Sequence, residues 1–328
     1  MTVKDTIISS MNTWGKERKP FLFFIDYKGE NGQVIPLDEV DQETIAYYVN
    51  GKTNQRIPSS LQQPHLHVNP IDFETYQARF NQVMQHIQKG NTYLINLTLA
   101  TPIVLEGSLF DVFHASKAKY KLAVKDQFVC FSPEIFVQIK ANRIYSYPMK
   151  GTIDASLPHA SRLILSDEKE TAEHYTIVDL IRNDLNIVAK NVRVDRFRYL
   201  DRLQTTKGDL LQMSSQISGD LQENWQEEVG TLLGQLLPAG SITGSPKQKT
   251  VAIIDAVEAY ERNYYTGVCG IFDGETLDTA VMIRFIEQQG EQWVYKSGGG
   301  ITFASQAEKE YEEILQKIYL PIEEKYKK

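Results

Sequence analysis

Hydrophobic residues recur along this chain with two periods, one typical of helices and one typical of strands. Residues 71–89 carry apolar side chains at the 3.6-residue spacing of a helix, and Gly90 follows as the residue expected to cap its C terminus. The apolar positions of this stretch are Tyr76, Phe80, Val83, Met84 and Ile87. The short apolar run Phe21–Tyr27 instead predicts a buried strand, and the turn residues Gly29–Gly32 predict a hairpin to a strand at Val34–Leu37.

The remaining elements are expected in blocks of strands and blocks of helices. Strands are expected at 91–100, 122–131, 134–139, 143–147, 192–200, 208–217, 268–272, 280–287 and 293–297, and helices within 1–20, 160–183, 225–236, 248–259 and 306–317. Residues 50–70 are polar and form the best loop candidate. Because these blocks do not follow a strict strand–helix–strand alternation, the sequence predicts an α+β fold with largely antiparallel sheets.

Composition narrows the class of protein. With 42% hydrophobic residues, the 328-residue chain can bury a large core, and we expect one compact unit over 1–328 because no repeat or linker divides it. A net charge of −7 argues against a nucleic-acid partner, and the apolar runs are too short to span a membrane. Two cysteines, Cys130 and Cys269, and an N terminus without a signal-peptide pattern fit a reduced, cytoplasmic protein.

The stretch Tyr147–Ile153 holds an amine in an unusual place. Pro148 fixes φ and Gly151 permits a sharp turn or a close approach, so the stretch predicts a buried strand that ends in a Lys-Gly-Thr turn. Lys150 would then lie at a strand end, where reactive groups are often displayed. For this segment taken alone, a surface lysine at an ordinary turn is the alternative.

Two pairs of glutamates are candidate metal ligands. Glu170 and Glu173 lie three residues apart on one predicted helix and therefore share a face. Glu310 and Glu313 repeat that spacing on the last helix, where Lys317 could pair with Glu313 or reach an anionic substrate. Like charges at this spacing cost about 0.2–0.5 kcal/mol per pair on an isolated helix, which a metal ion would offset. Four carboxylates without Cys or His favour Mg²⁺ over Zn²⁺, and acidic, solvated helix faces are the alternative.

Two glycine-rich segments could present backbone N–H groups to an anion. Gly298–Gly300 and the 240–244 segment each precede a strand or helix closely, and neither has the spacing of a phosphate-binding Walker loop. Plain tight turns are the alternative for both. Arg284 lies inside an apolar run, where its charge requires an anionic partner that is either structural or a substrate.

Six segments together resemble the chorismate-utilising enzymes, a family that includes anthranilate, aminodeoxychorismate, isochorismate and salicylate synthases. They are 148–152 (Pro-Met-Lys-Gly-Thr), 167–174 (Asp-x-Lys-Glu-x-x-Glu-His), 178–184 (Val-Asp-Leu-Ile-Arg-Asn-Asp), 238–247, 265–267 (Tyr-Thr-Gly) and 298–313. The resemblance implies one chorismate-binding catalytic domain with a shortened N-terminal portion of about 70 residues. Its expected fold is two stacked, largely antiparallel sheets flanked by helices, with the site between them.

The resemblance also implies roles for individual residues. Around a Mg²⁺ that chelates the ring carboxylate of chorismate, it places Glu170, Glu173, Glu310 and Glu313. It implies that the enolpyruvyl carboxylate is bound by Tyr265, Arg284, Gly299, Gly300 and Lys317. Thr152 is expected to be a polar contact near the ring, and Gln212, where many relatives have His, is expected to hold substrate through its amide.

Lys150 decides the branch of the family that the chain resembles. The anthranilate branch carries Ala at this turn, whereas the aminodeoxychorismate branch carries Lys, whose amine attacks C2 while the C4 hydroxyl leaves. Ammonia then attacks C4 and expels the lysine. Glu134 matches the general acid that protonates the departing hydroxyl. Holding a lysine neutral at pH 7 costs roughly 4–5 kcal/mol, a cost that desolvation and a nearby metal ion would lower.

Two departures from the family pattern affect the expected chemistry. Leu94 stands where the isochorismate and salicylate synthases place a water-activating Lys, which argues against water as the nucleophile. The N-terminal portion lacks the Leu-Leu-Glu-Ser segment of the family's tryptophan pocket. We therefore expect no feedback inhibition by tryptophan.

The nitrogen source is expected to lie outside this chain. A glutaminase of the type that serves this family needs a Cys elbow followed by His-x-Glu, and neither Cys130 nor Cys269 is followed by that motif. The resemblance implies a separate glutamine amidotransferase subunit that delivers ammonia. Anthranilate synthase component I and a non-catalytic binder of chorismate or Mg²⁺ are the alternative functions.

Overall fold

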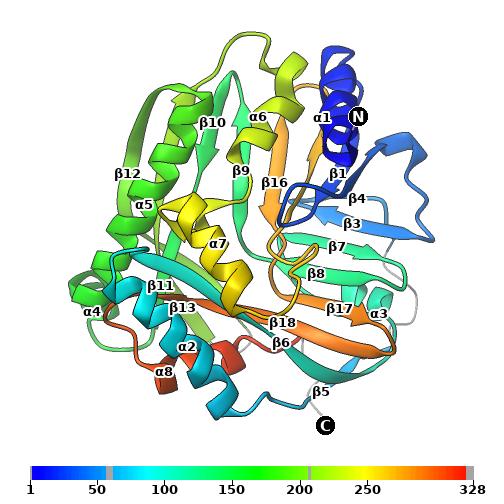
Figure 1. Cartoon of the computed structure of the whole chain (residues 1–328). Helices are drawn as coiled ribbons and strands as arrows, with labels where there is room; N and C mark the ends of the chain where they lie inside the picture. The colour runs from blue at the N-terminus through cyan, green and yellow to red at the C-terminus, as the bar shows by residue number, and fades with distance from the viewer. Residues whose placement is uncertain (1, 57–61, 206–207, 323–328) are drawn as a thin grey trace.

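Two antiparallel sheets of nine strands each form the centre of the computed structural model, which describes residues 2–56, 62–205 and 208–322 (Figure 1). The first sheet contains β1 (Phe21–Ile25), β2 (Gly32–Pro36), β9 (Ile135–Lys140), β10 (Arg143–Ser146), β11 (Met149–Asp154), β12 (Lys190–Thr205), β13 (Gly208–Asp220), β15 (Val268–Phe272) and β16 (Leu277–Val281). Its strand order is β11-β13-β10-β9-β16-β15-β1-β2, and β12 pairs with β13.

The second sheet has the order β14-β6-β18-β17-β8-β7-β3-β4, and β5 pairs with β6. Its strands are β3 (Ile45–Val49), β4 (Lys52–Thr53), β5 (His65–Val68), β6 (Leu94–Glu106), β7 (Tyr120–Val124), β8 (Phe128–Ser132), β14 (Gly244–Ser245), β17 (Phe285–Gln289) and β18 (Gln292–Ile301). The two antiparallel sheets and their flanking helices confirm the predicted α+β class.

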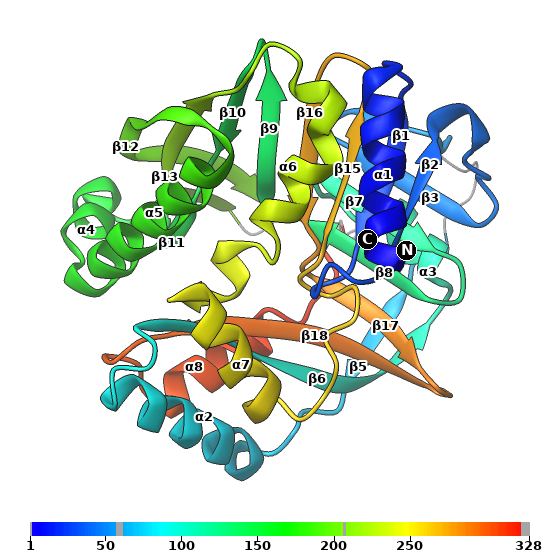
Figure 2. The same cartoon turned by 45° about the horizontal axis from the view of Figure 1, so that its top comes forward.

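The helices pack against the sheets and place the functional segments. They are α1 (Val3–Lys16), α2 (Phe73–Gln88), α3 (Leu109–Ala115), α4 (Ala160–Ser166), α5 (Glu168–Val188), α6 (Val229–Leu236), α7 (Lys247–Val257) and α8 (Ala307–Gln316), with 3₁₀ turns η1 (Leu37–Glu39), η2 (Trp225–Glu228) and η3 (Gly240–Ile242). Figure 2 shows α2, α7 and α8 along β6 and β18, whereas α1 and α6 lie together over the first sheet. None of the helices in the described ranges is both long and apolar enough to cross a membrane.

Aromatic side chains fill the space between the two sheets. Phe24 comes from the first sheet, and its ring lies 5.9 Å from that of Phe128 in the second. Phe128 also stacks on Phe285 at 4.9 Å and lies 5.0 Å from Tyr264. Both Phe128 and Phe285 are almost completely buried. Since rings of this size dominate the energy of a core, this cluster holds the sheets together.

Local sequence signals explain where the helix of the first glutamate pair begins. Asp167 is the N-cap of α5, and its side chain accepts a hydrogen bond from the backbone N–H of Glu170. Glu170 therefore lies in the first turn, where the helix dipole favours negative charge, and Glu173 lies one turn later. At the end of α2, Gly90 has the left-handed φ of +71° expected of a residue that follows a C-cap.

Several predicted elements differ from the structure. The single strand expected at 280–287 is two strands in different sheets, and Arg284, where the chain passes from one sheet to the other, has a φ of +54°. The strand expected at 122–131 is the β7–β8 hairpin, which turns where Asp126 has a φ of +57°. The loop expected at 50–70 contains β4 and β5, and residues 57–61 lie outside the described residues.

The Lys-Gly-Thr segment and the triple glycine are strands. Lys150 to Thr152 lie within β11, and the positive φ of Gly151 (+76°) accommodates an irregularity in the pairing with β13 where a turn was expected. Gly298–Gly300 continue β18 and pair in register with Asn96–Thr98 of β6. A Cβ on Gly298 would lie 2.5 Å from Thr98 Cγ2, so this close pairing of the two strands requires glycine there.

We expect Phe128→Ala to destabilise the protein by about 3–5 kcal/mol, because it empties the centre of the cluster between the sheets. Phe303→Ala is the matched control, since its ring is 73% exposed, and should change the free energy of unfolding by less than about 0.5 kcal/mol. Unfolding in denaturant, followed by circular dichroism, measures both. Equal effects of the two substitutions would contradict the assignment of this cluster as the core.

Candidate active site

Lys150 and Glu173 form a close ion pair between β11 and α5. The Lys150 Nζ lies 2.5 Å from Glu173 Oε2, and Glu173 is 5% exposed. The same Nζ would lie 3.9 Å from a Cβ placed on Gly300, so the amine also approaches the end of β18. With 28% of its side chain exposed, Lys150 is not the solvated surface lysine that was the alternative.

The charge state of Lys150 follows from its neighbours. Burial acts to lower the pKa of Lys150, in the expected direction, but Glu173, Glu170 and Glu313 outweigh it and raise that pKa above its ordinary value. The amine is therefore held as an ammonium by the carboxylates around it. Desolvation acts in the direction that was expected, and the expected effect of a metal ion on this amine stays a prediction.

The second glutamate pair lies against the glycines of β18. A Cβ on Gly299 would be 3.8 Å from Glu310 Oε2 and 3.9 Å from Glu313 Oε1. Lys317 Nζ is 2.7 Å from Glu313 Oε1 and donates a 2.8 Å hydrogen bond to the carbonyl of Gly298. Burial lowers the pKa of Lys317, against the opposing effect of Glu313. The C-terminal helix thus delivers two carboxylates and an ammonium to one point of the strand.

The first pair lies across from these groups on α5. A Cβ on Gly151 would be 2.9 Å from Glu170 Oε2, so only a glycine leaves that carboxylate its place. In the described part of the chain, no three carboxylate, histidine or cysteine groups form a ready-made metal cluster. The donor set nevertheless suits Mg²⁺, because the four groups are all oxygen donors and two of them, Glu173 and Glu310, are deeply buried. Mg²⁺ takes few protein ligands and fills its shell with water and substrate oxygens.

Glu134 has the surroundings of a protonated carboxylic acid. Ser241 Oγ donates a 2.5 Å hydrogen bond to Glu134 Oε1. Burial raises the pKa of Glu134, and the opposing effects of Ser241, Arg284 and Lys317 do not cancel it. The two side chains also line a small cavity of about 30 Å³ that is bounded by β9, β10 and α5. An acid held neutral by burial can donate a proton.

Arg284 and Tyr265 lie beside Glu134. Burial acts to lower the pKa of Arg284, but the nearby hydroxyls of Tyr295, Tyr319 and Tyr265 raise it, so the guanidinium stays charged. Its buried Nε has no hydrogen-bond partner among the described residues. Tyr265 is 2% exposed and packs on Phe285 at 5.9 Å. A buried cation with a spare donor is the arrangement that an anionic substrate group would complete.

Thr152 lies two residues from Lys150 on β11, and the contacts of Thr152 and Gln212 with substrate stay a prediction. The two residues are register partners on β11 and β13, and the Thr152 side chain is exposed. No hydrogen bond or ion pair within the described ranges links either side chain to Lys150 or to the glutamates. Leu94, by contrast, is buried, and its Cδ1 would lie 3.3 Å from a Cβ on Gly300. It forms an apolar wall next to the Lys150 amine.

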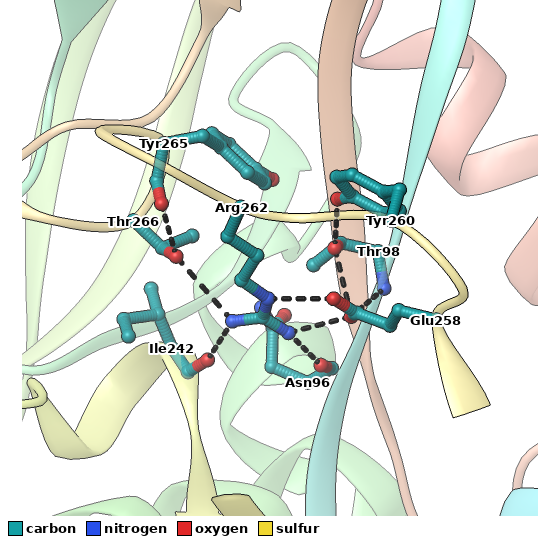
Figure 3. A network of polar contacts seen from close by, with 8 residues as sticks. All are labelled: Asn96, Thr98, Ile242, Glu258, Tyr260, Arg262, Tyr265 and Thr266. Atoms are coloured by element: carbon teal, nitrogen blue, oxygen red, sulfur yellow. Dashed lines mark hydrogen bonds and ion pairs between the residues drawn. The ribbon is translucent and has the colours of Figure 1, made fainter. Parts of the chain in front are cut away.

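Sequence reasoning missed Ser241 and a buried ion pair between Glu258 and Arg262. Ser241 lies in the small-residue segment that was considered only as an anion loop. The ion pair follows α7, and Figure 3 shows the Arg262 guanidinium between the Glu258 carboxylate, the Ile242 carbonyl and Thr266. Charged residues four apart at a helix end are usually solvated, so no sequence signal pointed to this pair.

Comparisons with known proteins place the chain among enzymes of one substrate class. The profile of a family described as chorismate binding enzyme matches residues 21–323. An "uncharacterized PabA-like protein" of Haemophilus influenzae is 52% identical over 316 residues, which are 96% of each chain. Aminodeoxychorismate synthase component 1 of Escherichia coli is 30% identical over 75% of this chain and 56% of its own. Anthranilate synthase component 1 1 of Haloarcula marismortui is 32% identical over 79% and 56%.

Solved structures show the same fold. A putative 2,3-dihydroxybenzoate-specific isochorismate synthase of Bacillus anthracis aligns with a TM-score of 0.72 and 20% identity over 96% of this chain and 86% of its own. Anthranilate synthase component I of Streptococcus pneumoniae aligns with a TM-score of 0.66 and 24% identity over 79% and 60%. The predicted fold of two stacked sheets flanked by helices is thereby confirmed.

We expect Glu134→Gln to change how stability depends on pH. A carboxyl whose folded pKa is raised contributes stability that is present below its unfolded pKa and lost as pH rises through its folded pKa. The variant lacks this loss, so its free energy of unfolding relative to the natural protein should increase from pH 4 to pH 8. Denaturant unfolding across that range measures it. The exposed Glu291→Gln is the control, and a difference for Glu134→Gln that does not vary with pH would contradict a buried acid.

Proposed function

Since the chain belongs to the family of chorismate binding enzymes, we propose that it catalyses the Mg²⁺-dependent amination of chorismate to 4-amino-4-deoxychorismate. The observation that carries this proposal is the position of the Lys150 amine, 2.5 Å from Glu173 and close to Gly300 at the end of β18. A lysine at this point supplies a nucleophile to a substrate whose carboxylates are held by the glycine strand and by Lys317 and Arg284.

The chain's own residues can perform the chemistry in two displacements. In the first, the Lys150 ammonium gives up a proton to solvent, the resulting neutral amine forms a bond to C2 of the ring, both ring double bonds shift, and the C4–oxygen bond breaks. Glu134 gives its proton to the departing hydroxyl, which leaves as water. In the second, ammonia bonds to C4, both double bonds shift back, and the C2–nitrogen bond breaks to return the lysine as a neutral amine, while a proton of the new C4 ammonium restores Glu134. Leu94 borders the amine and cannot activate water as a competing nucleophile.

Glu170, Glu173, Glu310 and Glu313 are the residues that would hold Mg²⁺. When bound, the ion would neutralise the ring carboxylate and orient the substrate, as Lewis-acid metal sites do. Gly299 lies close to the second glutamate pair, and Gly300 lies close to Lys150. The absence of side chains on both leaves room for a ring above the strand.

Ammonia would come from a separate glutamine amidotransferase subunit, because neither Cys130 nor Cys269 is followed by the His-x-Glu motif of a glutaminase. Two relatives bear names with "component 1", which supports an assembly of this kind. The product would then require elimination of pyruvate by another enzyme to give p-aminobenzoate, a precursor of folate.

Anthranilate synthesis is the second candidate, because an anthranilate synthase component is 32% identical to this chain, as similar as the aminodeoxychorismate relative. In that reaction the amine enters at C2 and pyruvate is released, so a covalent lysine has no part in it. The presence of Lys150, where the anthranilate branch has Ala, favours the first candidate.

We expect purified protein to consume chorismate with Mg²⁺ and ammonium, and to form p-aminobenzoate only when a lyase is added. Lys150→Ala should slow the loss of chorismate by at least about 10³-fold, as removal of a nucleophile does. Lys140→Ala, an exposed lysine on β9, should have no effect. Near-normal turnover by Lys150→Ala would contradict the covalent lysine intermediate. Formation of fluorescent anthranilate would favour the second candidate. Unchanged chorismate with the natural protein would indicate a non-catalytic binder.

We expect Glu310→Gln to weaken Mg²⁺ binding by at least about tenfold, because it removes the charge of a buried ligand. Calorimetric titration of Mg²⁺ into protein with chorismate, without ammonium, measures the affinity directly. Glu308→Gln is the matched control on the same helix, since Glu308 is exposed. Removal of Mg²⁺ with a chelator should stop turnover, and Mg²⁺ affinity equal in the two variants would contradict the site.

A further inference from the structure

The most deeply buried ion pair next to the proposed site has no part in the chemistry above. The side chains of Arg262 and Glu258 are 2% and 1% exposed, and their charged groups lie 2.6 and 2.7 Å apart. Replacing such a pair by apolar residues is often neutral or stabilising, since two charges lose their hydration when they are buried. Stability alone therefore does not explain this pair.

Arg262 connects three elements that each carry a residue of the proposed site (Figure 3). Its Nη1 donates a 2.8 Å hydrogen bond to the carbonyl of Ile242 in η3, and its Nη2 donates a 2.7 Å hydrogen bond to the carbonyl of Asn96 in β6. A weaker contact of 3.4 Å runs to Thr266 Oγ1, next to Tyr265. Asn96 pairs in register with Gly300, and Ile242 follows Ser241.

Glu258 fixes the guanidinium in this orientation. It accepts two hydrogen bonds from Arg262, and a separate 2.8 Å bond from each of the Thr98 backbone N–H and hydroxyl. Tyr260 completes the group by a hydrogen bond with the Thr98 hydroxyl. The planar fork of Arg262 can therefore point in one direction only, which a flexible ammonium could not reproduce.

The three elements differ in how much they need this support. β6 is a thirteen-residue strand that is paired with β18 along nine residues, so its position is set by the sheet. η3 is a three-residue turn without a side-chain cap at its N terminus; the Thr243 hydroxyl donates hydrogen bonds to the carbonyls of Ala239 and Gly240, and the sheet holds only the residues after it, where β14 pairs with β6. The Arg262 backbone itself is held independently, because the buried Lys296 donates to the carbonyls of Glu261 and Arg262. The element that depends most on the guanidinium is therefore η3.

We propose that Arg262, oriented by Glu258, is a positioning residue that fixes the Gly240–Ile242 turn and so keeps the Ser241 hydroxyl on Glu134. The contact it protects is the 2.5 Å hydrogen bond from Ser241 to the carboxyl that we assign as proton donor. Its catalytic consequence rests on the proposed function. Arg262 touches no reacting atom and acts through Ser241.

Kinetics of a double-mutant cycle test this pathway. Arg262→Lys keeps the charge beside Glu258 but cannot reach both carbonyls, so kcat for chorismate loss should fall about 10- to 100-fold while KM changes less than about threefold. Ser241→Ala should have a similar effect, and the double variant should lose no more than Ser241→Ala alone. Losses that multiply, or an unchanged kcat in Arg262→Lys, would overturn the proposal.

Two controls separate positioning from general loss of stability. Asn12→Ala removes the hydrogen bonds between α1 and α6, away from the site, and should lower stability while kcat is retained. If Arg262→Lys does not fold, the apolar pair Arg262→Met with Glu258→Met replaces it, because it leaves no buried unpaired charge. We expect the same loss of kcat in that variant, and no further loss when its two substitutions are added to Ser241→Ala, compared with Ser241→Ala alone. Retained kcat would overturn the proposal.

Hydrogen exchange tests, without an activity assay, whether Arg262 fixes the Gly240–Ile242 turn. Arg262→Lys should speed amide exchange in residues 239–243, and Asn12→Ala should not, whether or not the protein aminates chorismate. If the natural protein consumes no chorismate, the proposed function fails, yet faster exchange in this segment still supports the positioning role. Exchange that is the same in Arg262→Lys and the natural protein overturns it.

Discussion

The ion pair between Lys150 and the buried Glu173 is the interaction on which the arrangement of the site depends. A carboxylate that is 5% exposed is costly to bury unless a cation compensates it. Lys150 supplies that cation from β11, the edge strand of the first sheet. Lys317 pairs with Glu313, whose side chain is more exposed, beside the glycines of β18. Helices α5 and α8 can thus approach one region of the molecule although both carry acidic faces.

Glycine makes this convergence possible on the strand side. At Gly299 and Gly300, carboxylates and ammonium groups lie 3.8–3.9 Å from the point where a Cβ would start, which is van der Waals contact, so a side chain longer than a methyl group would compete for their space. At Gly151, the Glu170 carboxylate is closer still. The site is therefore formed where two backbones without side chains let four acidic and two basic groups meet, which is a packing constraint before it is a chemical one.

Much of this fold was predictable from local patterns, and the exceptions have a common cause. The helix of residues 73–88 follows from its apolar stripe and its cap, and the β1–β2 hairpin follows from its turn residues. The break at Arg284 was missed, because a positive φ at an arginine is imposed by the two sheets that the chain joins there. Thr152 and Gln212 were assigned by resemblance alone, and their contacts with substrate stay a prediction. Ser241 and Arg262 act through tertiary contacts that no sequence spacing encodes.

Two buried ion pairs contact the loop between α7 and β15, and each binds a different set of backbone carbonyls. Lys296, paired with Glu287, binds the loop's carbonyls from the side of β18. Arg262, paired with Glu258, faces the other way and binds the carbonyls of η3 and β6. Because the first pair already anchors the loop, the second can hold η3, a turn that is tied to the sheet only at its C-terminal end, where β14 pairs with β6. Small residues such as Gly240 and Ser241 can then stand next to Glu134 without the flexibility that such a segment would otherwise have.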